Sequence, residues 1–172
     1  MSAKGFTVLE VLVAMAVGSV VIMIAVPALN EVVRRARHGA AVRRVLDDVR
    51  EARSRAIRTG WEYRLVGYDS DETGARRNQY RILARQSTAV AWPGEEDAPF
   101  ESSTQLALSW IDVASEYPGI DFDSTSARFQ LTFDPRGTAP DASTSFNPLH
   151  VRGPDGLDVS LTVSVVGGAR VE

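Results

Sequence analysis

The stretch Val11–Leu29, VLVAMAVGSVVIMIAVPAL, decides the fold of this chain, because its 19 residues carry no charge. As an α-helix it would span about 28 Å, which is close to the thickness of the hydrocarbon layer of a bilayer. The preceding segment, residues 1–5, is too short for an ordinary secretory signal, and no small-residue cleavage site follows the apolar run. We therefore expect residues 6–29 to form a membrane-spanning helix that stays attached to the rest of the protein.

Glu10 is the one charged residue between Phe6 and Leu29. Inserting a carboxylate near the end of an apolar helix costs about 2–3 kcal/mol, so such a residue usually has a partner or a function. The alternative is a side chain that sits at the level of the lipid headgroups without a partner.

The sequence Lys4-Gly5-Phe6-Thr7-Val8-Leu9-Glu10 resembles the processing signal of type IV prepilins and type II secretion pseudopilins. The resemblance implies that a prepilin peptidase removes the leader, residues 1–5, by cutting between Gly5 and Phe6, and then methylates Phe6. It implies that Glu10 meets the N-terminal amine of a neighbouring subunit during assembly, which would satisfy the carboxylate. It also implies a subunit above this one, because the tip-most subunit of a secretion pseudopilus tends to lack this glutamate.

Gly18 and Pro27 lie inside the expected membrane helix. Pro27 falls where many members of this superfamily have a proline that kinks the helix, since proline removes a backbone hydrogen bond. The two residues bracket a stretch that could loosen in a filament.

Two signals for membrane topology disagree. Lys4 flanks the apolar run on one side, and Arg34, Arg35 and Arg37 flank it on the other, so the positive-inside rule alone would place the head in the cytoplasm. The processing signal is more specific than this count. It implies a single-pass protein of the bacterial inner membrane with its head in the periplasm, which then joins a periplasmic pseudopilus or a cell-surface pilus.

Residues 30–60 continue the helix as an amphipathic segment. Apolar residues recur at spacings of three and four and form one stripe, at Val42, Val45, Val49, Ala52 and Ala56. Gly60 predicts the end of the helix, and Gly39 is a weak position inside it.

Charge is segregated along the chain. Residues 34–58 carry nine arginines against three acids, whereas residues 86–125 hold eight acids and no Lys or Arg. The two regions could attract each other between subunits, or they could be independently solvated faces. The arginines could also contact DNA phosphates, but we interpret them as a solvated helix face.

Residues 61–172 form the head, where apolar and polar residues alternate in a way typical of half-buried antiparallel strands. The apolar positions are Trp61, Tyr63 and Leu65; Tyr80, Ile82 and Ala84; Phe129, Leu131 and Phe133; and Leu157, Val159, Leu161, Val163 and Val165. Arg81 and Leu83 alternate with the second set. The predicted fold class is α+β: a long N-terminal helix, transmembrane in one half and amphipathic in the other, packed on a small antiparallel β head of one or two sheets.

Turn-forming residues separate these strands. Asp134-Pro135-Arg136-Gly137 suits a type I turn, and Gly153-Pro154-Asp155-Gly156 predicts a hairpin. Residues 92–103 and 139–148 read as loops, and the first is expected to be a long surface excursion.

Two further stretches resemble the GspH/FimT group of minor pseudopilins and minor pilins. Residues 52–60, ARSRAIRTG, look like the end of the long helix of that group, and residues 131–139, LTFDPRGTA, look like its strand–turn signature. The resemblance implies a helix packed on two β-sheets and a structural role in initiating or capping a filament near its tip. The sequence does not choose between a type II secretion pseudopilus and a type IV pilus.

One member type of this group binds DNA for natural transformation through a Gly-Arg-x-Arg-like stretch near the C-terminus. In the corresponding end of this chain, residues 166–172, Arg170 remains as a DNA or partner contact, whereas Ala169 and Glu172 stand in place of the arginines of that motif. DNA uptake is therefore the alternative function, which the acid at the end of the chain disfavours.

Composition excludes cysteine-based chemistry, and the sequence shows no persuasive active-site motif. The chain has no cysteine, and His38 and His150 have no obviously spaced partners. There is no glycine-rich phosphate loop or nucleophile elbow, and Asp121 and Asp123 are interpreted as solvated carboxylates in a loop. We expect an assembly subunit that has no enzymatic activity, cofactor or metal. Its expected partners are other minor and major pilin or pseudopilin subunits, prepilin peptidase, the inner-membrane assembly platform and the lipid bilayer.

Overall fold

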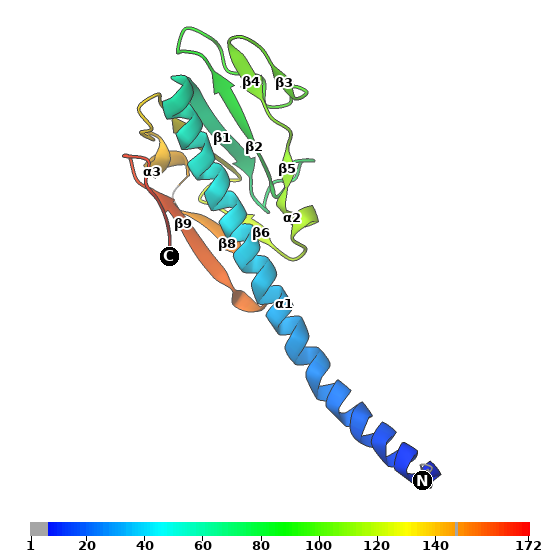
Figure 1. The fold of residues 1–172 in the computed structure, drawn as a ribbon. Coiled ribbons are helices and arrows are strands. Elements are labelled where there is room, and N and C mark those ends of the chain that lie inside the picture. The colour runs from blue at the N-terminus through cyan, green and yellow to red at the C-terminus, as the bar shows by residue number, and fades with distance from the viewer. Residues whose placement is uncertain (1–6, 147) are drawn as a thin grey trace, which may run out of the picture. The chain divides into compact units, whose positions relative to one another are not determined.

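A computed structural model describes residues 7–146 and 148–172 of the chain. It shows an α+β protein in which a long helix, α1 (Val8–Thr59), precedes two antiparallel sheets (Figure 1). The chain divides into two compact units, Met1–Ala36 and Arg37–Glu172. The predicted fold class is confirmed.

Helix α1 ends where the sequence predicts. Gly60 has a φ of +71°, and its N–H donates to the Ala56 carbonyl at 3.0 Å. This left-handed residue closes the last turn at no steric cost to a glycine. The helix is unbroken at Gly39, which the sequence had marked as a weak position.

The larger sheet contains β1 (Glu62–Tyr68), β2 (Gln79–Arg85), β3 (Phe100–Glu101), β4 (Gln105–Ala107), β5 (Ile111–Asp112) and β7 (Arg128–Phe133). The strand order is β3-β4-β2-β1-β7, and β5 pairs with β2 beyond β4. In this register Leu65 of β1 lies between Ile82 of β2 and Leu131 of β7. Alternate residues of β7 are buried, as its period-two pattern predicts.

The smaller sheet contains β6 (Asp121–Asp123), β8 (Leu149–Arg152), β9 (Asp158–Val163) and β10 (Ala169–Val171), in the order β10-β9-β8-β6. The predicted hairpin joins β8 to β9 through a short 3₁₀ helix, η1 (Pro154–Gly156). Strand β9 ends two residues earlier than expected. Val165 is exposed because Ser164–Gly168 forms the turn into β10, in which the Gly167 N–H donates to the Ser164 carbonyl.

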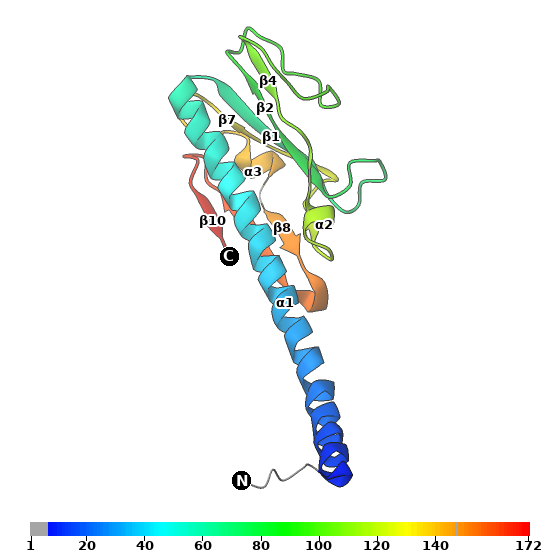
Figure 2. The ribbon, with the colours of Figure 1, turned by 45° about the vertical axis from the view of Figure 1, so that its right-hand side comes forward.

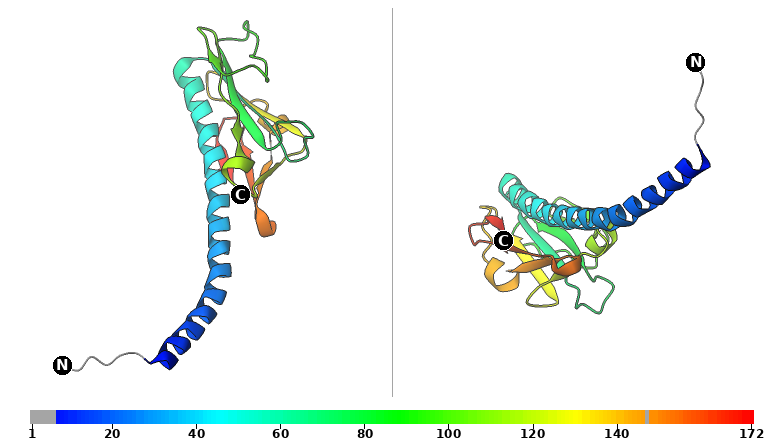
Figure 3. Two further views of the ribbon diagram at one scale, coloured as in Figure 1. Left: turned by 90° about the vertical axis from the view of Figure 1, so that its right-hand side faces the viewer. Right: turned by 90° about the horizontal axis from the view of Figure 1, so that it is seen from below.

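The core lies between the second half of α1 and both sheets. The five residues of the predicted stripe are buried and belong to one cluster with inward-facing residues of the two sheets. Figure 3 shows the cyan part of α1 lying along one side of the strands. Packing of α1 on the head begins at His38, one turn before the predicted stripe, whereas residues 30–37 are exposed.

His38 has a partner that the sequence did not reveal. Its side chain is buried, and its Nε2 lies 2.8 Å from the Val151 carbonyl of β8. His150 is half-buried, with Nδ1 3.1 Å from an Asp158 carboxylate oxygen. Both histidines therefore hold elements of the head together.

The outer face of β2 is covered, contrary to the predicted alternation. Arg81 and Leu83 are both buried, because the segment after β2 folds back over the sheet. Arg81 Nη1 donates to the Glu95 and Asp97 carbonyls at 2.7 and 2.9 Å. Trp92 from this segment packs over Leu83 in a second, smaller core. The segment expected to be a long surface loop, residues 92–103, thus packs over the outer face of the larger sheet.

Two other predicted loops contain ordered structure. Residues 139–148 include a short helix, α3 (Ala142–Ser145), and Phe146 just after it is buried. Asp121 and Asp123 lie in β6, where the first accepts from Asn78 Nδ2 at 2.7 Å and the second pairs with Arg152. A second short helix, α2 (Val113–Glu116), precedes β6. Both aspartates are therefore strand residues with partners, rather than solvated loop carboxylates.

Two glycine substitutions should change stability in opposite directions. A Cβ on Gly67 of β1 would lie 2.3 Å from Phe129 Cζ and 2.9 Å from Tyr80 Cβ, whereas one on Gly39 would meet only Arg43 Nη2 at 3.7 Å. Gly67→Ala should lower the free energy of unfolding of the head by about 1–3 kcal/mol. Gly39→Ala should raise it by about 0.5–1 kcal/mol, because alanine is the better helix former. Urea titration of the full chain in detergent measures both, and equal effects would contradict this packing.

Alkaline pH should weaken the contact between α1 and β2. The Tyr80 hydroxyl donates to an Asp48 carboxylate oxygen at 2.5 Å, and burial followed by this carboxylate raises the pKa of Tyr80. Because the folded-state pKa lies above the unfolded value of about 10, this stabilisation is complete below pH 10 and is lost as pH rises above it. Tyr80→Phe should lower stability at neutral pH and flatten its fall above pH 10. An unchanged alkaline slope in thermal unfolding would contradict this assignment.

Candidate assembly surfaces

The first half of α1 is apolar and exposed around its whole circumference. It contains an 18-residue window with a mean hydropathy of 2.6, and the described residues bury none of this window. By length and composition, the helix could therefore cross a membrane. The exposed side chains include Leu12, Met15, Ile22 and Ile24. A helix that is apolar all round is a membrane span or is buried by other chains.

Glu10 forms a capping box with Thr7 at the start of this helix. The Glu10 N–H donates to Thr7 Oγ1 at 3.2 Å, and Glu10 Oε2 accepts from the Thr7 N–H at 3.1 Å and from Thr7 Oγ1 at 3.2 Å. These bonds satisfy backbone donors of the first turn, and the carboxylate lies where the helix dipole favours an acid. Sequence reasoning missed this local role, although Thr7-Val8-Leu9-Glu10 has the spacing of a capping box.

The other predicted residues of this segment remain untested. Gly5 and Phe6 lie outside the described residues. The helix is continuous at Gly18 and Pro27, and the predicted kink at these positions stays a prediction. Ser19, next to Gly18, donates a hydrogen bond from its Oγ to the Ala16 carbonyl at 2.8 Å.

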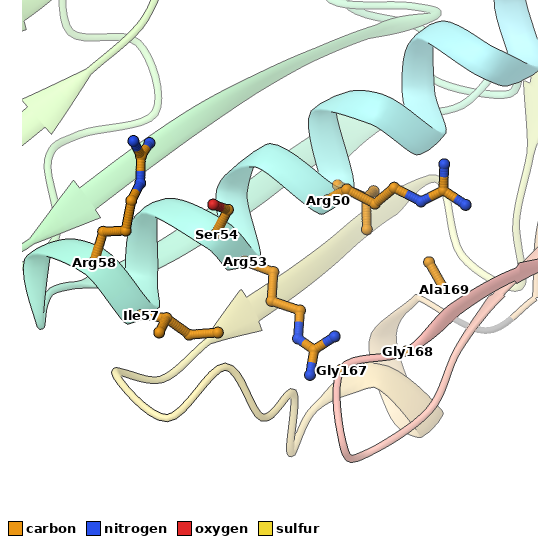
Figure 4. A pocket seen from close by; sticks show the side chains of 9 residues that line it. Arg50, Arg53, Ser54, Ile57, Arg58, Gly167, Gly168 and Ala169 are labelled. Atoms are coloured by element: carbon orange, nitrogen blue, oxygen red, sulfur yellow. The ribbon is translucent and has the colours of Figure 1, made fainter.

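A groove of about 520 Å³ lies on the head between the last turns of α1 and the β9–β10 turn (Figure 4). Its lining residues are Val49, Arg50, Arg53, Ser54, Ile57, Arg58, Gly167, Gly168 and Ala169. The helical members are spaced so that they form one flank of α1. The groove therefore combines apolar surface with three arginines.

Arg53 fixes the shape of this groove. Its Nε donates to the Gly137 carbonyl and its Nη2 to the Val166 carbonyl, each at 3.0 Å. A Cβ on Gly167 would lie 2.0 Å from the Gly137 carbonyl oxygen and 2.7 Å from Arg53 Nε. Two turns far apart in sequence are thus held against each other and against α1.

The predicted Asp134–Gly137 turn is confirmed as part of this arrangement. The Gly137 N–H donates to the Asp134 carbonyl at 2.8 Å, and Asp134 Oδ1 accepts from the backbone N–H groups of Arg136 and Thr138. Burial opposes ionisation of Asp134, but the hydrogen bonds from Thr138 and Arg136 outweigh it and lower the pKa of this carboxyl. The strand–turn stretch therefore positions the carbonyl to which Arg53 binds.

Arg50 and Arg58 are the exposed cations of the groove. Arg50 lies 3.6 Å from an Asp47 oxygen and Arg58 lies 3.4 Å from a Glu51 oxygen, with 61% and 65% of the arginine side chains exposed. Ion pairs at such exposure contribute little to stability. Both side chains can therefore turn toward another acidic group at little cost.

Arg170 is separated from these arginines by the sheet. It lies in β10 between Ala169, which lines the groove, and Val171. Because successive side chains of a strand point to opposite faces, Arg170 faces away from the side of the sheet that Ala169 occupies. Arg170, the predicted contact residue, and the arginines of α1 thus lie at the same edge of the smaller sheet but on its opposite faces.

One carboxylate cluster among the described residues has metal-ligand spacing, formed by Asp69, Asp71 and Asp123. Asp69 is buried and accepts from the Asp71 N–H at 2.9 Å, while Asp123 pairs with Arg152. Acidic groups of this kind are common without an ion, and we assign no metal to them.

Comparisons with known proteins support the two resemblances found in the sequence. Residues 41–167 match the family model of the type II transport protein GspH, and residues 1–26 match that of the prokaryotic N-terminal methylation motif. No curated protein and no solved structure matched the chain. The first match covers most of the chain, including the larger sheet and most of the smaller one, and it ends just before β10.

Removing Arg53 should loosen the β9–β10 turn. Arg53→Ala deletes two hydrogen bonds to backbone carbonyls and should reduce the local free energy of opening by about 1–3 kcal/mol. Amide hydrogen exchange at Gly167, whose N–H donates to the Ser164 carbonyl at 2.7 Å, measures this opening. Arg50→Ala is the matched control, because the ion pair that Arg50 makes among the described residues is with Asp47 of its own helix. Equal exchange rates in the two variants would refute the positioning role of Arg53.

Proposed function

The chain belongs to the GspH family of type II transport proteins, and from this premise we propose that it is a minor pseudopilin that helps to initiate or cap a filament. With its N-terminal methylation motif, the chain is a pilin-like pseudopilin of type II secretion that prepilin peptidase processes. The sequence motifs alone did not distinguish a type II secretion pseudopilus from a type IV pilus. The match to a type II transport family favours the secretion pseudopilus.

The observation that carries the proposal is the exposed apolar half of α1 with Glu10 in its first turn. Before assembly, lipid would cover this helix, and the capping box would limit the cost of inserting the carboxylate. In a filament, neighbouring helices would replace the lipid. A carboxylate among them is stable only when a cation reaches it, and the new amine of a neighbouring Phe6 could supply that cation.

The proposed cellular location follows from this transfer of the helix from lipid to filament. The single apolar helix fits an anchor in the inner membrane, and we place the head in the periplasm, where a pseudopilus forms. Family membership implies processing by prepilin peptidase and assembly with other subunits. We further propose contact with the inner-membrane assembly platform, which would transfer the helix from lipid to filament.

Processing should leave N-methyl-Phe6 as the first residue of the mature chain. Mass spectrometry of the N-terminal peptide measures this directly. Gly5→Val, which changes the residue before the cleaved bond, should leave the leader attached. A wild-type chain that begins at Met1, or one cut after Ala28, would contradict the assignment.

Glu10 should be needed for assembly rather than for membrane insertion. Glu10→Val should leave insertion intact and reduce incorporation into filaments at least about tenfold, since it removes the partner of the amine. Glu10→Gln keeps the side-chain geometry that a capping box uses but lacks the charge, so it should fail in the same way. The control is Glu31→Gln, a carboxylate on the same helix that pairs with Arg35. Quantitative immunoblotting of membranes and sheared filaments gives both readouts, and normal incorporation of Glu10→Gln would show that the charge has no partner.

A further inference from the structure

Strand β10 presents an unpaired edge beside the arginine groove. It is the terminal strand of the smaller sheet and pairs with β9 on one side only within the described chain. Figure 2 shows β10 at the margin of the head, next to α1. Such an edge is a template for a further strand from another chain.

The register shows which backbone groups face outward. Ser160 and Glu172 exchange both of their backbone hydrogen bonds, each at 2.9 Å, and the Ser164 N–H donates to the Gly168 carbonyl. In an antiparallel pair, hydrogen-bonded and non-hydrogen-bonded positions alternate. The N–H and C=O groups of Ala169 and Val171 therefore point away from β9, toward the open edge.

The surface around this edge is cationic and apolar. The flank of α1 contributes Arg50 and Arg58 on the side of the sheet where Ala169 lies. Val166, Val171 and Ile57 are 69%, 43% and 52% exposed at the same end of the head. On the opposite face, Glu172 lies two residues after Arg170 and offsets its charge, so the side toward α1 is the more positive one.

We propose that an extended, acidic segment of another filament subunit adds as a strand to the free edge of β10, with its carboxylates facing Arg50 and Arg58. Backbone bonds to Ala169 and Val171 would supply the pairing, and the arginines would select acids on alternate residues. The inference rests on the proposed function, because it gives one contact by which a filament subunit holds its neighbour.

A second copy of this chain fits the groove less well. Most of the acids in its residues 86–125 are already engaged within its own head; for example, Glu95 pairs with Arg128 and Glu96 pairs with Arg76. Asp112 caps α2 by accepting from the Ser115 N–H at 2.9 Å, and Asp121 accepts from Asn78. The partner we assign is therefore a different subunit with a free acidic strand.

The test uses the full chain in lipid nanodiscs and a short fluorescent peptide of alternating valine and aspartate. Fluorescence anisotropy should show binding that Arg50→Glu/Arg58→Glu weakens by about tenfold or more, because charge reversal makes a like-charge contact. The matched control, Arg43→Glu/Arg77→Glu, makes the same charge change at exposed residues outside the groove lining and should leave binding unchanged. A peptide of alternating valine and lysine should not bind.

A second pair of variants separates strand addition from simple charge attraction. Val171→Pro removes the N–H that faces the open edge and leaves the ladder to β9 intact, so it should weaken binding, whereas Val171→Ala should not. Equal affinity of these two variants would overturn the strand geometry. Three other results would each overturn the assigned partner. The first is absence of peptide binding, and the second is binding of a short single-stranded DNA at the same arginines in place of the peptide. The third is self-association of the chain that Arg50→Glu/Arg58→Glu abolishes.

The result is distinguishable from failure of the proposed function. A chain that carries N-methyl-Phe6 and needs Glu10 for incorporation, yet does not bind the peptide, refutes only the groove assignment. A chain that binds the peptide but keeps its leader refutes only the proposed processing and assembly.

Discussion

The apolar side chains of residues 8–29 have to be covered by something other than the head, and the rest of the account depends on this constraint. Each exposed valine, leucine or isoleucine costs about 1.5–3 kcal/mol in water relative to an apolar surrounding. The described residues bury none of the most apolar window. Lipid and neighbouring helices are two environments that meet this requirement, and we propose that this chain uses them in succession. We propose that Glu10 distinguishes the two environments: its capping box would make the carboxylate tolerable in lipid, and a neighbouring cation would do so in the filament.

The second half of α1 obeys a different constraint. There the stripe from Val42 to Ala56 is buried against two sheets, and the arginines lie on the remaining faces. One of these arginines, Arg53, binds two carbonyls of separate turns, so it acts as part of the architecture. Its neighbours Arg50 and Arg58 stay exposed and lie beside the open edge of β10. The same helix therefore organises the head, and we propose that it also anchors the subunit and presents a surface to other chains.

Local patterns predicted the helix, its end at Gly60, the alternation in β7 and the turn at Asp134–Gly137, because each depends on residues close together in sequence. The cover over β2 could not be predicted, since burial of Arg81 depends on carbonyls more than ten residues away and on Trp92 packing over Leu83. The partner of His38 was missed for the same reason, because Val151 is 113 residues distant. For the candidate site, Glu10 was predicted from its charge in an apolar run and from the motif around it, but the groove requires α1 and β10 to meet. Only the tertiary structure brings Arg53 to Gly137 and Val166.

The most direct measurement is an isotope-filtered solid-state NMR experiment on filaments that contain this chain. The subunit would carry ¹³C in its glutamate carboxyl groups, and all other subunits would carry ¹⁵N. An ion pair between subunits predicts dipolar coupling between the Glu10 carboxyl carbon and the α-amine nitrogen of a different subunit, at the typical separation of about 4 Å. Filaments that incorporate the chain normally but show no such coupling between subunits would contradict it.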